Sequence, residues 1–271
     1  MEDLPVKLFD AFSAELVFAL DICEQAGKIA LTHFNDGIEA VMKEDGSPVT
    51  AADKVCERLI REAIAAKFPQ DAILGEEEGA SAGASHLVAE PSGRKWIVDP
   101  IDGTYGYARG LPIFSTLLAL EKDGEIVLGV VHAPAMEHLY WAEKGRGAFK
   151  NGQRIRVSDK VELADSQLSF GGINRIHALG YWQGFTNLVT STYRQRGFGD
   201  YLGFACVFEG KAEAHIEVGV KPWDLAPMKI ITEEAGGKFT DLEGGNSVYT
   251  GSCVTSNGLN HQQWLQTLTT K

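Results

Sequence analysis

The chain has 271 residues, 44% of them hydrophobic and 23% charged, and its formal net charge is −12. This length allows one large core or two closely packed halves, and the composition is ordinary for a soluble globular enzyme. The strong negative charge argues against nucleic acid or an acidic membrane surface as the main partner.

We expect neither a secretion signal nor a membrane span. Residues 1–5 are acidic and lack the basic-then-apolar pattern of a secretion signal, and no apolar run approaches the roughly 18 residues that span a bilayer. The four cysteines are scattered, without a Cys-x-x-Cys pair, at Cys23, Cys56, Cys206 and Cys253. They predict free thiols in a reducing compartment, so we expect a cytoplasmic protein.

The first predicted elements are helices. Long apolar periodicity with few breakers predicts one helix over 6–34. Apolar residues also share one face at helical spacing over 50–68, where Thr50 and Asp53 have the spacing of an N-terminal capping box. The small, polar residues of 79–93 predict a loop.

The rest of the chain is rich in strands and then alternates. Strands are predicted at 113–120, 125–131 and 138–141, with a hairpin turn at 122–124. Beyond these we predict helices at 180–193, 200–209 and 223–235 and a strand at 214–218, with Gly236 and Gly237 closing the last helix. A long helix, a mixed sheet and then alternation indicate α/β layers around two sheets.

The most informative motif is Asp-Pro-Ile-Asp-Gly-Thr at 99–104, which follows an apolar, β-branched run. Pro100 cannot donate to a sheet, so we expect the strand to stop at Asp99. Gly103 allows a tight turn and close approach to a ligand. Asp99 and Asp102 at a strand end, followed by a glycine and a hydroxyl, indicate a cleft where hard cations and an anion meet.

Asp-Pro and Asp-Gly are also ordinary turn formers, so this motif alone could mark a surface turn. Further acidic positions favour a site: Asp53, Glu76 in Gly-Glu-Glu at 75–77, and Asp224 in Trp-Asp at 223–224. With these motifs in order, the chain resembles the inositol monophosphatase family of magnesium-dependent phosphomonoesterases. The resemblance extends from about residue 43 to residue 257.

The resemblance implies an α/β (α+β layered) fold, the αβαβα sandwich of the inositol monophosphatase and fructose-1,6-bisphosphatase type. It implies that residues 1–271 form a single catalytic unit, with approximate halves at 1–145 and 146–271. It also implies a homodimer and two or three Mg²⁺ per active site. Bound cations would reverse the local field of an acidic cleft, so that an anionic phosphate ester could enter.

The same resemblance implies a set of metal ligands. Glu76, Asp99 and the backbone carbonyl of Ile101 would hold the first metal. Asp99, Asp102 and Asp224 would hold the second, and Glu76 would support a third cation through water.

The resemblance also implies which residues bind the substrate and the attacking water near these metals. Substrate would lie against Asp102, and the backbone amides of Gly103 and Thr104 would bind its phosphate. Thr104 would orient or deprotonate the attacking water, in a catalytic group with Glu76 and Asp53.

Several of these residues have structural alternatives. Asp53 could serve mainly as half of a capping box, and Asp224 could be an aspartate favoured at a helix start. Glu77 and Glu78 are read as solvated. The seven histidines are scattered and none joins the acidic motifs, so histidine-based catalysis is not expected.

The substrate is indicated by Asp200 and Glu217. Inositol phosphatases of the family usually place small residues near position 200, whereas a carboxylate there would pair with a cationic tail. Glu217 suits inositol hydroxyls or an amino group. Gly-Asp-Tyr at 199–201 and Val-Lys-Pro-Trp-Asp at 220–224 resemble the histidinol-phosphate phosphatase branch. Asp200 could instead cap a helix beside Gly199.

Other charged and aromatic residues are less specific. Lys221, Arg194 and Arg196 could steer phosphate or merely balance surface acids, and the second role is favoured. The residues after Thr104, namely Tyr105, Tyr107 and Arg109, are placed at the mouth of the cleft.

The sequence therefore predicts Mg²⁺-dependent hydrolysis of a small phosphorylated alcohol, with L-histidinol phosphate preferred. Inositol monophosphate is the second candidate, and broad sugar-phosphate or nucleotide hydrolysis is the third. The alternative from another class is a metal-binding scaffold or regulatory protein that has lost activity.

Overall fold

The computed structural model describes residues 12–37, 40–42, 48–81 and 93–270. The helices are α2 (Ala14–Asp36), α3 (Ala51–Lys67), α4 (Thr104–Tyr107), α5 (Ile173–Ala178), α6 (Trp182–Ser191), α7 (Asp200–Phe208), α8 (Pro222–Glu234) and α9 (His261–Thr269), with 3₁₀ turns η1 (Pro134–Met136) and η2 (Leu163–Asp165). The strands of the first half are β1 (Ala40–Met42), β2 (Pro48–Thr50), β3 (Ala72–Gly75), β4 (Gly79–Ser81), β5 (Arg94–Asp102), β6 (Ser115–Lys122), β7 (Glu125–Ala133) and β8 (His138–Glu143). Those that follow are β9 (Gly147–Lys150), β10 (Gln153–Arg154), β11 (Gln167–Phe170), β12 (Arg194–Arg196), β13 (Ala214–Val218), β14 (Lys238–Thr240) and β15 (Ser252–Ser256).

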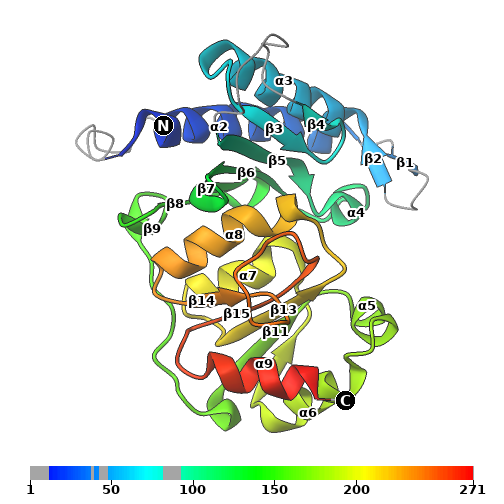
Figure 1. Ribbon diagram of the computed structural model, residues 1–271. Helices are drawn as coiled ribbons and strands as arrows, with labels where there is room; N and C mark the ends of the chain where they lie inside the picture. The colour runs from blue at the N-terminus through cyan, green and yellow to red at the C-terminus, as the bar shows by residue number, and fades with distance from the viewer. Residues whose placement is uncertain (1–11, 38–39, 43–47, 82–92, 271) are drawn as a thin grey trace.

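The elements form five layers, and the predicted αβαβα sandwich is confirmed (Figure 1). Helices α2 and α3 cover one face of an eight-stranded sheet, in the order β10-β9-β8-β7-β6-β5-β3-β4. Helices α7 and α8 fill the middle layer. A five-stranded sheet follows, in the order β12-β11-β13-β15-β14, and α6 and α9 close the stack.

Alternation along the strands divides the core between these layers. Trp96 and Val98 of β5 belong to the apolar cluster under α2 and α3, whereas Ile97 belongs to the cluster that includes α7 and α8. A third cluster joins the smaller sheet to α6 and α9, with Trp264 fully enclosed. Successive side chains of a strand point to opposite faces, so each sheet has an apolar layer on both sides.

The two N-terminal helices begin at capping side chains. Ser13 Oγ accepts from the Leu16 amide at 3.1 Å, and the helix predicted over 6–34 is confirmed from residue 14 onward, since residues 6–11 lie outside the described part. The predicted capping box of α3 is also confirmed: Asp53 Oδ2 accepts from the Thr50 amide at 2.8 Å. Both caps satisfy amides that a helix start leaves unpaired.

Strand β5 is longer than the sequence predicts. The expectation that it stops at Asp99 is wrong, because Asp102 pairs again with Ser115 of β6 after a register shift between Asp99 and Asp102. The shift takes Pro100, which has no N–H, out of the regular ladder. Residues three apart on a regular strand face opposite sides, so this irregularity lets Asp99 and Asp102 reach one cavity.

Helix α8 lies close against β7 because of a glycine. A Cβ on Gly129 would come within 2.8 Å of the Pro227 Cα and within 2.7 Å of a methyl group of Ile230. Any larger residue at this position would push α8 away from the sheet. The close contact therefore sets how far Asp224, in the first turn of α8, lies from β5.

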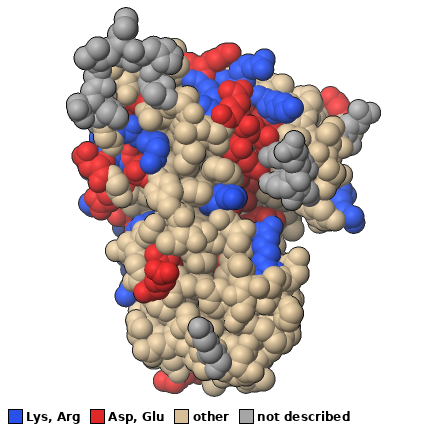
Figure 2. Space-filling view, turned by 45° about the vertical axis from the view of Figure 1, so that its right-hand side comes forward, with Lys and Arg blue, Asp and Glu red and all other residues tan. Residues whose placement is uncertain are grey.

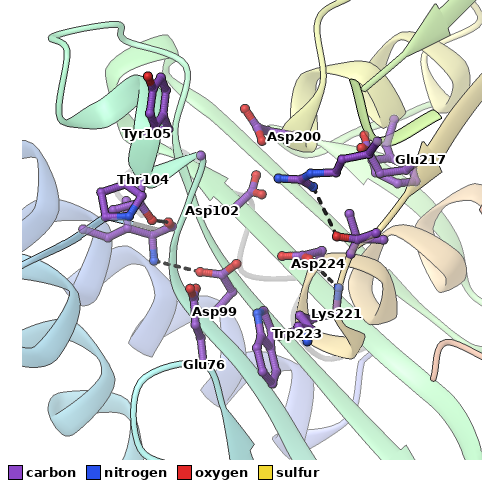
Figure 3. Close-up of a pocket in the computed structure, with 17 residues that line it drawn as sticks. Glu76, Asp99, Asp102, Thr104, Tyr105, Asp200, Glu217, Lys221, Trp223 and Asp224 are labelled. Atoms are coloured by element: carbon purple, nitrogen blue, oxygen red, sulfur yellow. Dashed lines mark hydrogen bonds between the residues drawn. The ribbon is translucent and has the colours of Figure 1, made fainter. Parts of the chain in front are cut away.

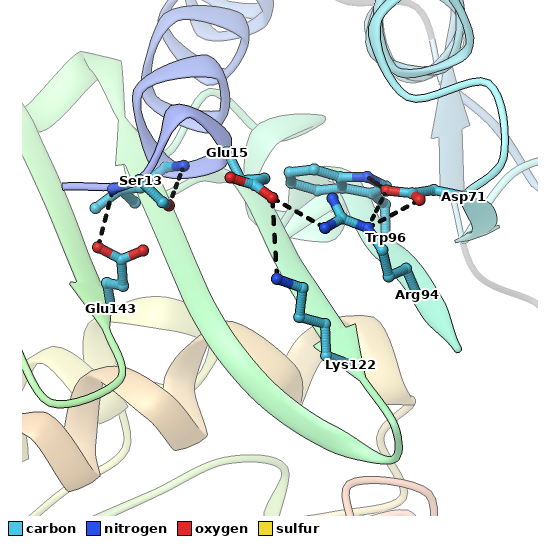
Figure 4. A network of polar contacts seen from close by, with 8 residues as sticks. Ser13, Glu15, Asp71, Arg94, Trp96, Lys122 and Glu143 are labelled. Carbon is cyan, nitrogen blue, oxygen red and sulfur yellow. Dashed lines mark hydrogen bonds and ion pairs between the residues drawn. The ribbon is translucent and has the colours of Figure 1, made fainter. Parts of the chain in front are cut away.

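A polar network fastens α2 to the sheet on the side away from this cavity (Figure 4). Arg94 Nη1 lies 2.9 Å from Glu15 Oε1, and Arg94 Nε lies 2.9 Å from Asp71 Oδ1. Trp96 Nε1 also donates to Asp71 at 2.9 Å. The guanidinium is planar and donates on two sides, so it holds the helix and the strand together.

Acidic side chains gather in a band on the upper part of the molecule that leads toward a hollow, with basic side chains at its border (Figure 2). The four cysteines are free, as predicted, and all four are buried. Within the described ranges, the helices are too short or too polar to cross a bilayer. The division into halves at 1–145 and 146–271 stays a proposal; β9 and β10 of the larger sheet lie beyond residue 145.

Candidate active site

A cavity of about 480 Å³ lies where the middle helical layer meets the ends of the strands (Figure 3). It is lined from several elements far apart in sequence: the residues after β3, the end of β5, the start of α4, and the first turns of α7 and α8. The end of β13 completes it. Ends of strands and starts of helices present side chains and unpaired amides together, which makes such an edge a common ligand site in α/β proteins.

Three carboxylates converge in this cavity. Asp99, Asp102 and Asp224 each offer an oxygen atom, and these atoms lie within 4.8 Å of one another. Asp99 and Asp102 are buried and Asp224 is half-buried. Like charges this close repel strongly in a site sheltered from water, so the group favours protons or a bound cation.

The pKa values of the three carboxyls reflect this crowding. Burial first, and then the charges of neighbouring acids, raise the pKa of Asp99 and the pKa of Asp102 well above the usual range. Burial first, with Glu76 and Glu217 nearby, raises the pKa of Asp224 to about 7. Hydrogen bonds from Ser115 Oγ at 3.1 Å and from the Tyr201 amide at 2.8 Å partly compensate the charge of Asp102.

Glu76 lies beside Asp99 because their strands are neighbours (Figure 3). Strands β3 and β5 are parallel, with Gly75 opposite Val98, so Glu76 and Asp99 follow at the same edge of the sheet. The Glu76 amide donates to the Val98 carbonyl at 3.2 Å, which continues the ladder up to the carboxylate.

Glu57 supports the turn that follows Glu76, and sequence reasoning missed it. Its buried carboxylate accepts from the amides of Glu77 at 2.8 Å and Glu78 at 3.1 Å, and from Arg61 Nε at 2.7 Å. Glu57 and Arg61 are four residues apart on α3, a spacing typical of helical ion pairs. That spacing was the available signal; the contact with the turn was not readable from the sequence.

Thr104 begins α4 and contacts both Ile101 and Asp53. Its hydroxyl donates to the Ile101 carbonyl at 2.8 Å and lies 3.5 Å from Asp53 Oδ1. Asp53 is fully enclosed, and burial first, with Glu76 nearby, raises its pKa. Asp53 can therefore cap α3 and belong to the acidic group at the same time.

Gly103 precedes this short helix in the left-handed region, with φ of 81°. A Cβ there would lie 3.0 Å from the Ile113 carbonyl and 3.3 Å from Asp200 Oδ2. A side chain at this position would be strained and crowded, so glycine keeps the backbone of residues 103 and 104 open to the cavity.

Asp200 and Glu217 line the opposite side of the cavity (Figure 3). The residue that caps α7 is Gly199, which has no side chain, so the reading of Asp200 as the cap is wrong. Asp200 has φ of 46°, a strained conformation that aspartate tolerates better than most residues. Burial first, and then the charge of Glu217, raise the pKa of Asp200 to about 6.

Two residues near Asp200 and Glu217 were not anticipated. Arg175 of α5 lines the cavity, and its charge partly offsets the rise in the pKa of Asp200. His215 lies two residues before Glu217, and its Nε2 is 3.2 Å from Glu217 Oε2. The expectation about histidines concerned the acidic motifs, and Glu217 lies outside them; period-two spacing on a strand places His215 and Glu217 on one face.

Of the remaining charged and aromatic residues, some lie where the sequence predicted and others do not. Tyr105 and Lys221 line the cavity. Tyr107 is buried and donates to the Ala30 carbonyl, so its placement at the mouth is wrong. Arg109 stacks over the Tyr105 ring, 5.0 Å from its centroid. Three residues were favoured as surface charges: Arg194 and Arg196 are exposed on β12, whereas Lys221 is exposed but also lines the cavity.

Known proteins resemble this chain over nearly its full length. A histidinol-phosphatase of Mycobacterium tuberculosis is 37% identical over 260 residues, covering 94% of this chain and 97% of the relative. An inositol-1-monophosphatase of Mesorhizobium japonicum is 33% identical, covering 91% and 93%. The crystal structure of the extragenic suppressor protein suhB of Bartonella henselae has a TM-score of 0.86 at 29% identity, covering 95% of this chain and 99% of that one.

The family is shown by a further match over residues 13–271 to the inositol monophosphatase family. The chain belongs to the inositol monophosphatase family. It is therefore a phosphoric monoester hydrolase, and its substrate is a small phosphate ester. The family is metal-dependent, and the cluster of Asp99, Asp102 and Asp224 could bind a metal ion.

Proposed function

We propose that this protein is a Mg²⁺-dependent phosphatase that hydrolyses L-histidinol phosphate to L-histidinol and phosphate. The observation that carries the metal-dependent part is the convergence of Asp99, Asp102 and Asp224 within 4.8 Å. An all-oxygen donor set with strong negative charge suits Mg²⁺, which prefers carboxylates and keeps several waters. The burial of Asp99 and Asp102 adds support, since buried like charges need a counterion.

The residues that would hold cations fall into two overlapping sets. Glu76, Asp99 and the Ile101 carbonyl form one set, and Asp99, Asp102 and Asp224 form the other. The Ile101 carbonyl also accepts from Thr104 Oγ1 at 2.8 Å, and its second lone pair stays available. Bound divalent cations would supply a water of lowered pKa and stabilisation of the leaving oxygen.

Thr104 would position the attacking water. Its Oγ1 can accept a hydrogen bond from water while it donates to Ile101 or Asp53. As water attacks, its proton would pass to Thr104 Oγ1, and the hydroxyl proton would pass to Asp53 Oδ1. The raised pKa of Asp53 favours this transfer, since a carboxylate of higher pKa is a stronger base.

The phosphate and alcohol ends of the substrate would bind on different sides of the cavity. The amides of residues 103 and 104 would donate to the phosphate, beside Asp102. Asp200 and Glu217 would receive the other end, where an ammonium or imidazolium group could pair with their charges. The relative named histidinol-phosphatase supports this choice of substrate.

Inositol monophosphate is the second candidate. Glu217 can accept hydrogen bonds from hydroxyl groups as well as from an amine, and the Mesorhizobium japonicum relative is named inositol-1-monophosphatase. Asp200 favours the cationic substrate, since a neutral polyol gains less from a carboxylate.

Phosphate release from p-nitrophenyl phosphate tests the metal-dependent hydrolysis without assuming the natural alcohol. We expect turnover with Mg²⁺, loss of turnover with a chelator, and recovery when Mg²⁺ is restored. Thermal stabilisation by Mg²⁺ without turnover on any of the candidate esters would instead indicate a metal-binding scaffold.

A further inference from the structure

A buried histidine stands directly behind Glu217. His215 and Glu217 belong to the same strand, β13 (Ala214–Val218), and point to the same face because side chains alternate along a strand. The His215 side chain is fully enclosed, and Glu217 is 5% exposed. Of the two, only Glu217 lines the cavity within the described chain.

A chain of polar contacts runs from the sheet through this histidine. His215 Nδ1 lies 3.1 Å from Ser169 Oγ on the neighbouring strand β11, and His215 Nε2 lies 3.2 Å from Glu217 Oε2. The Nε2–Oε2 contact is at ion-pair distance, but its geometry lies outside that of a hydrogen bond, and neither atom has a hydrogen-bond partner among the described residues. A carboxylate can only accept, so a proton on Nε2, with Nδ1 accepting from the Ser169 hydroxyl, is the tautomer that suits this contact.

The imidazole has little room to turn. The Phe204 ring lies edge-on, with its centroid 4.4 Å from that of His215. A Cβ on Gly203 would come within 2.3 Å of His215 Cε1, so α7 passes directly over the ring. The orientation of the ring, with Nε2 toward Glu217, is therefore set by packing on one side and by Ser169 on the other.

Glu217 is confined in the same way. A Cβ on Gly171 would lie 1.8 Å from Glu217 Oε1, so the carboxylate occupies space that only a glycine leaves open. Its Oε2 is buried 3.2 Å from His215 Nε2, and the residue lines the cavity. The carboxylate thus lies between the imidazole and the cavity.

We propose that His215 is a positioning residue for substrate selection: it holds the Glu217 carboxylate in the orientation that receives the alcohol end of the substrate. This inference rests on the proposed function, because it needs an ester whose alcohol part reaches Glu217. Loss of the imidazole would remove the polar group that lies against this buried carboxylate oxygen, and Glu217 would turn away from its place.

The test compares two esters in variants of His215. Histidinol phosphate carries groups that can reach Glu217, whereas the flat nitrophenyl ring of p-nitrophenyl phosphate offers it no donor. In His215→Phe we expect the ratio of kcat/KM for histidinol phosphate to that for p-nitrophenyl phosphate to fall about tenfold, mainly through KM. His215→Gln, whose Nε2 can donate to Glu217, should recover most of this ratio.

Two further variants keep the test decisive. Ser169→Ala leaves the imidazole but removes the partner of Nδ1, so it should lower the same ratio about threefold and serves if His215→Phe does not fold. His261→Phe is the matched control, since His261 is also buried between two hydroxyls, those of Thr240 and Ser256, and lies outside the cavity. It should leave the ratio unchanged.

Three outcomes would overturn the positioning role. The two esters could lose activity in parallel, or the ratio could stay unchanged. His215→Phe could also fold with a lowered ratio that His215→Gln does not recover. Failure of the proposed substrate is a different result, in which the wild-type protein does not hydrolyse histidinol phosphate. The ratio is then measured with myo-inositol 1-phosphate, whose hydroxyls can donate to Glu217, and the same outcomes apply.

Discussion

Asp99 is the residue common to both proposed cation sets, and it is almost completely buried beside Glu76 and Asp102. Its Oδ1 also accepts from the Ile101 amide at 3.0 Å, so the carboxylate is held in place by the bulge that follows it. Removal of its charge should therefore affect the bound cations more than the fold.

Asp99→Asn should lower kcat for p-nitrophenyl phosphate by about a thousandfold or more while the circular dichroism spectrum stays that of the wild type. The amide keeps the shape of the carboxylate but loses its charge. Asp123→Asn, in an exposed hairpin turn with φ of 51°, is the matched control and should retain full activity. Substantial turnover by Asp99→Asn would contradict the assignment of the metal ligands.

Asp200 is the residue on which the choice of substrate depends. Asp200→Asn keeps the side-chain shape and the tolerance for positive φ, so it isolates the charge. We expect it to lower kcat/KM for histidinol phosphate about tenfold or more and for myo-inositol 1-phosphate less than threefold. Asp200→Ser should show the same order of effects with some added loss of stability. Equal losses on the two esters would mean that the charge of Asp200 does not select the substrate.

The acidic carboxyls also make stability depend on pH. The folded-state pKa of Asp200 is raised to about 6 and that of Asp224 to about 7, above the value of 3.8 taken for an unperturbed aspartate. Between about pH 4 and pH 7 the folded protein therefore binds more protons than the unfolded chain, and the free energy of unfolding falls as pH rises.

Thermal unfolding measures this directly. Without metal, the midpoint should be lower at pH 8 than at pH 5.5, and added Mg²⁺ should raise it more at pH 8, where the carboxylates are ionised. A Mg²⁺ shift of equal size at both pH values would show that the crowded carboxyls are not where the cation binds.

At the scale of single elements, helix α3 does more than cover the sheet. Its first turn carries Asp53, and its second and third turns carry Glu57 and Arg61, which hold the turn after Glu76. One helix therefore sets the positions of two residues of the proposed catalytic group.

Glu57→Ala should lower the free energy of unfolding by about 3 kcal/mol, because it leaves Arg61 and two turn amides without their buried partner. It should also weaken the dependence of activity on Mg²⁺ by displacing Glu76. Glu62→Ala, on the exposed face of the same helix, should change neither. Denaturant unfolding checks the first effect, and an unchanged midpoint would exclude the support role of Glu57.

The elements differ in how far the sequence predicts them. The capping box at Thr50 and Asp53 and strand β13 at 214–218 were predicted as they are found, because each depends on local chemistry. The end of β5 was not, because the bulge past Pro100 depends on pairing with β6. Glu57 and Arg175 were missed since their importance comes from contacts with distant parts of the chain, whereas His215 was missed although its period-two spacing from Glu217 could be read from the sequence.

At the scale of the whole molecule, the cavity joins parts of the two sheets. Asp99 and Asp102 come from the larger sheet and Glu217 from the smaller one, with α7 and α8 between them. Periodicity indicates layers but does not say which edges meet, so the grouping of these residues came from the family resemblance. The homodimer implied by that resemblance stays a prediction.

The measurement that tests the central claim most directly is initial phosphate release, with Mg²⁺, from histidinol phosphate and myo-inositol 1-phosphate at matched concentrations. The account predicts a preference for histidinol phosphate of about 100-fold or more, which is about 2.7 kcal/mol of discrimination in the transition state. A preference for myo-inositol 1-phosphate would contradict the proposed substrate and the role of Asp200 in selecting it.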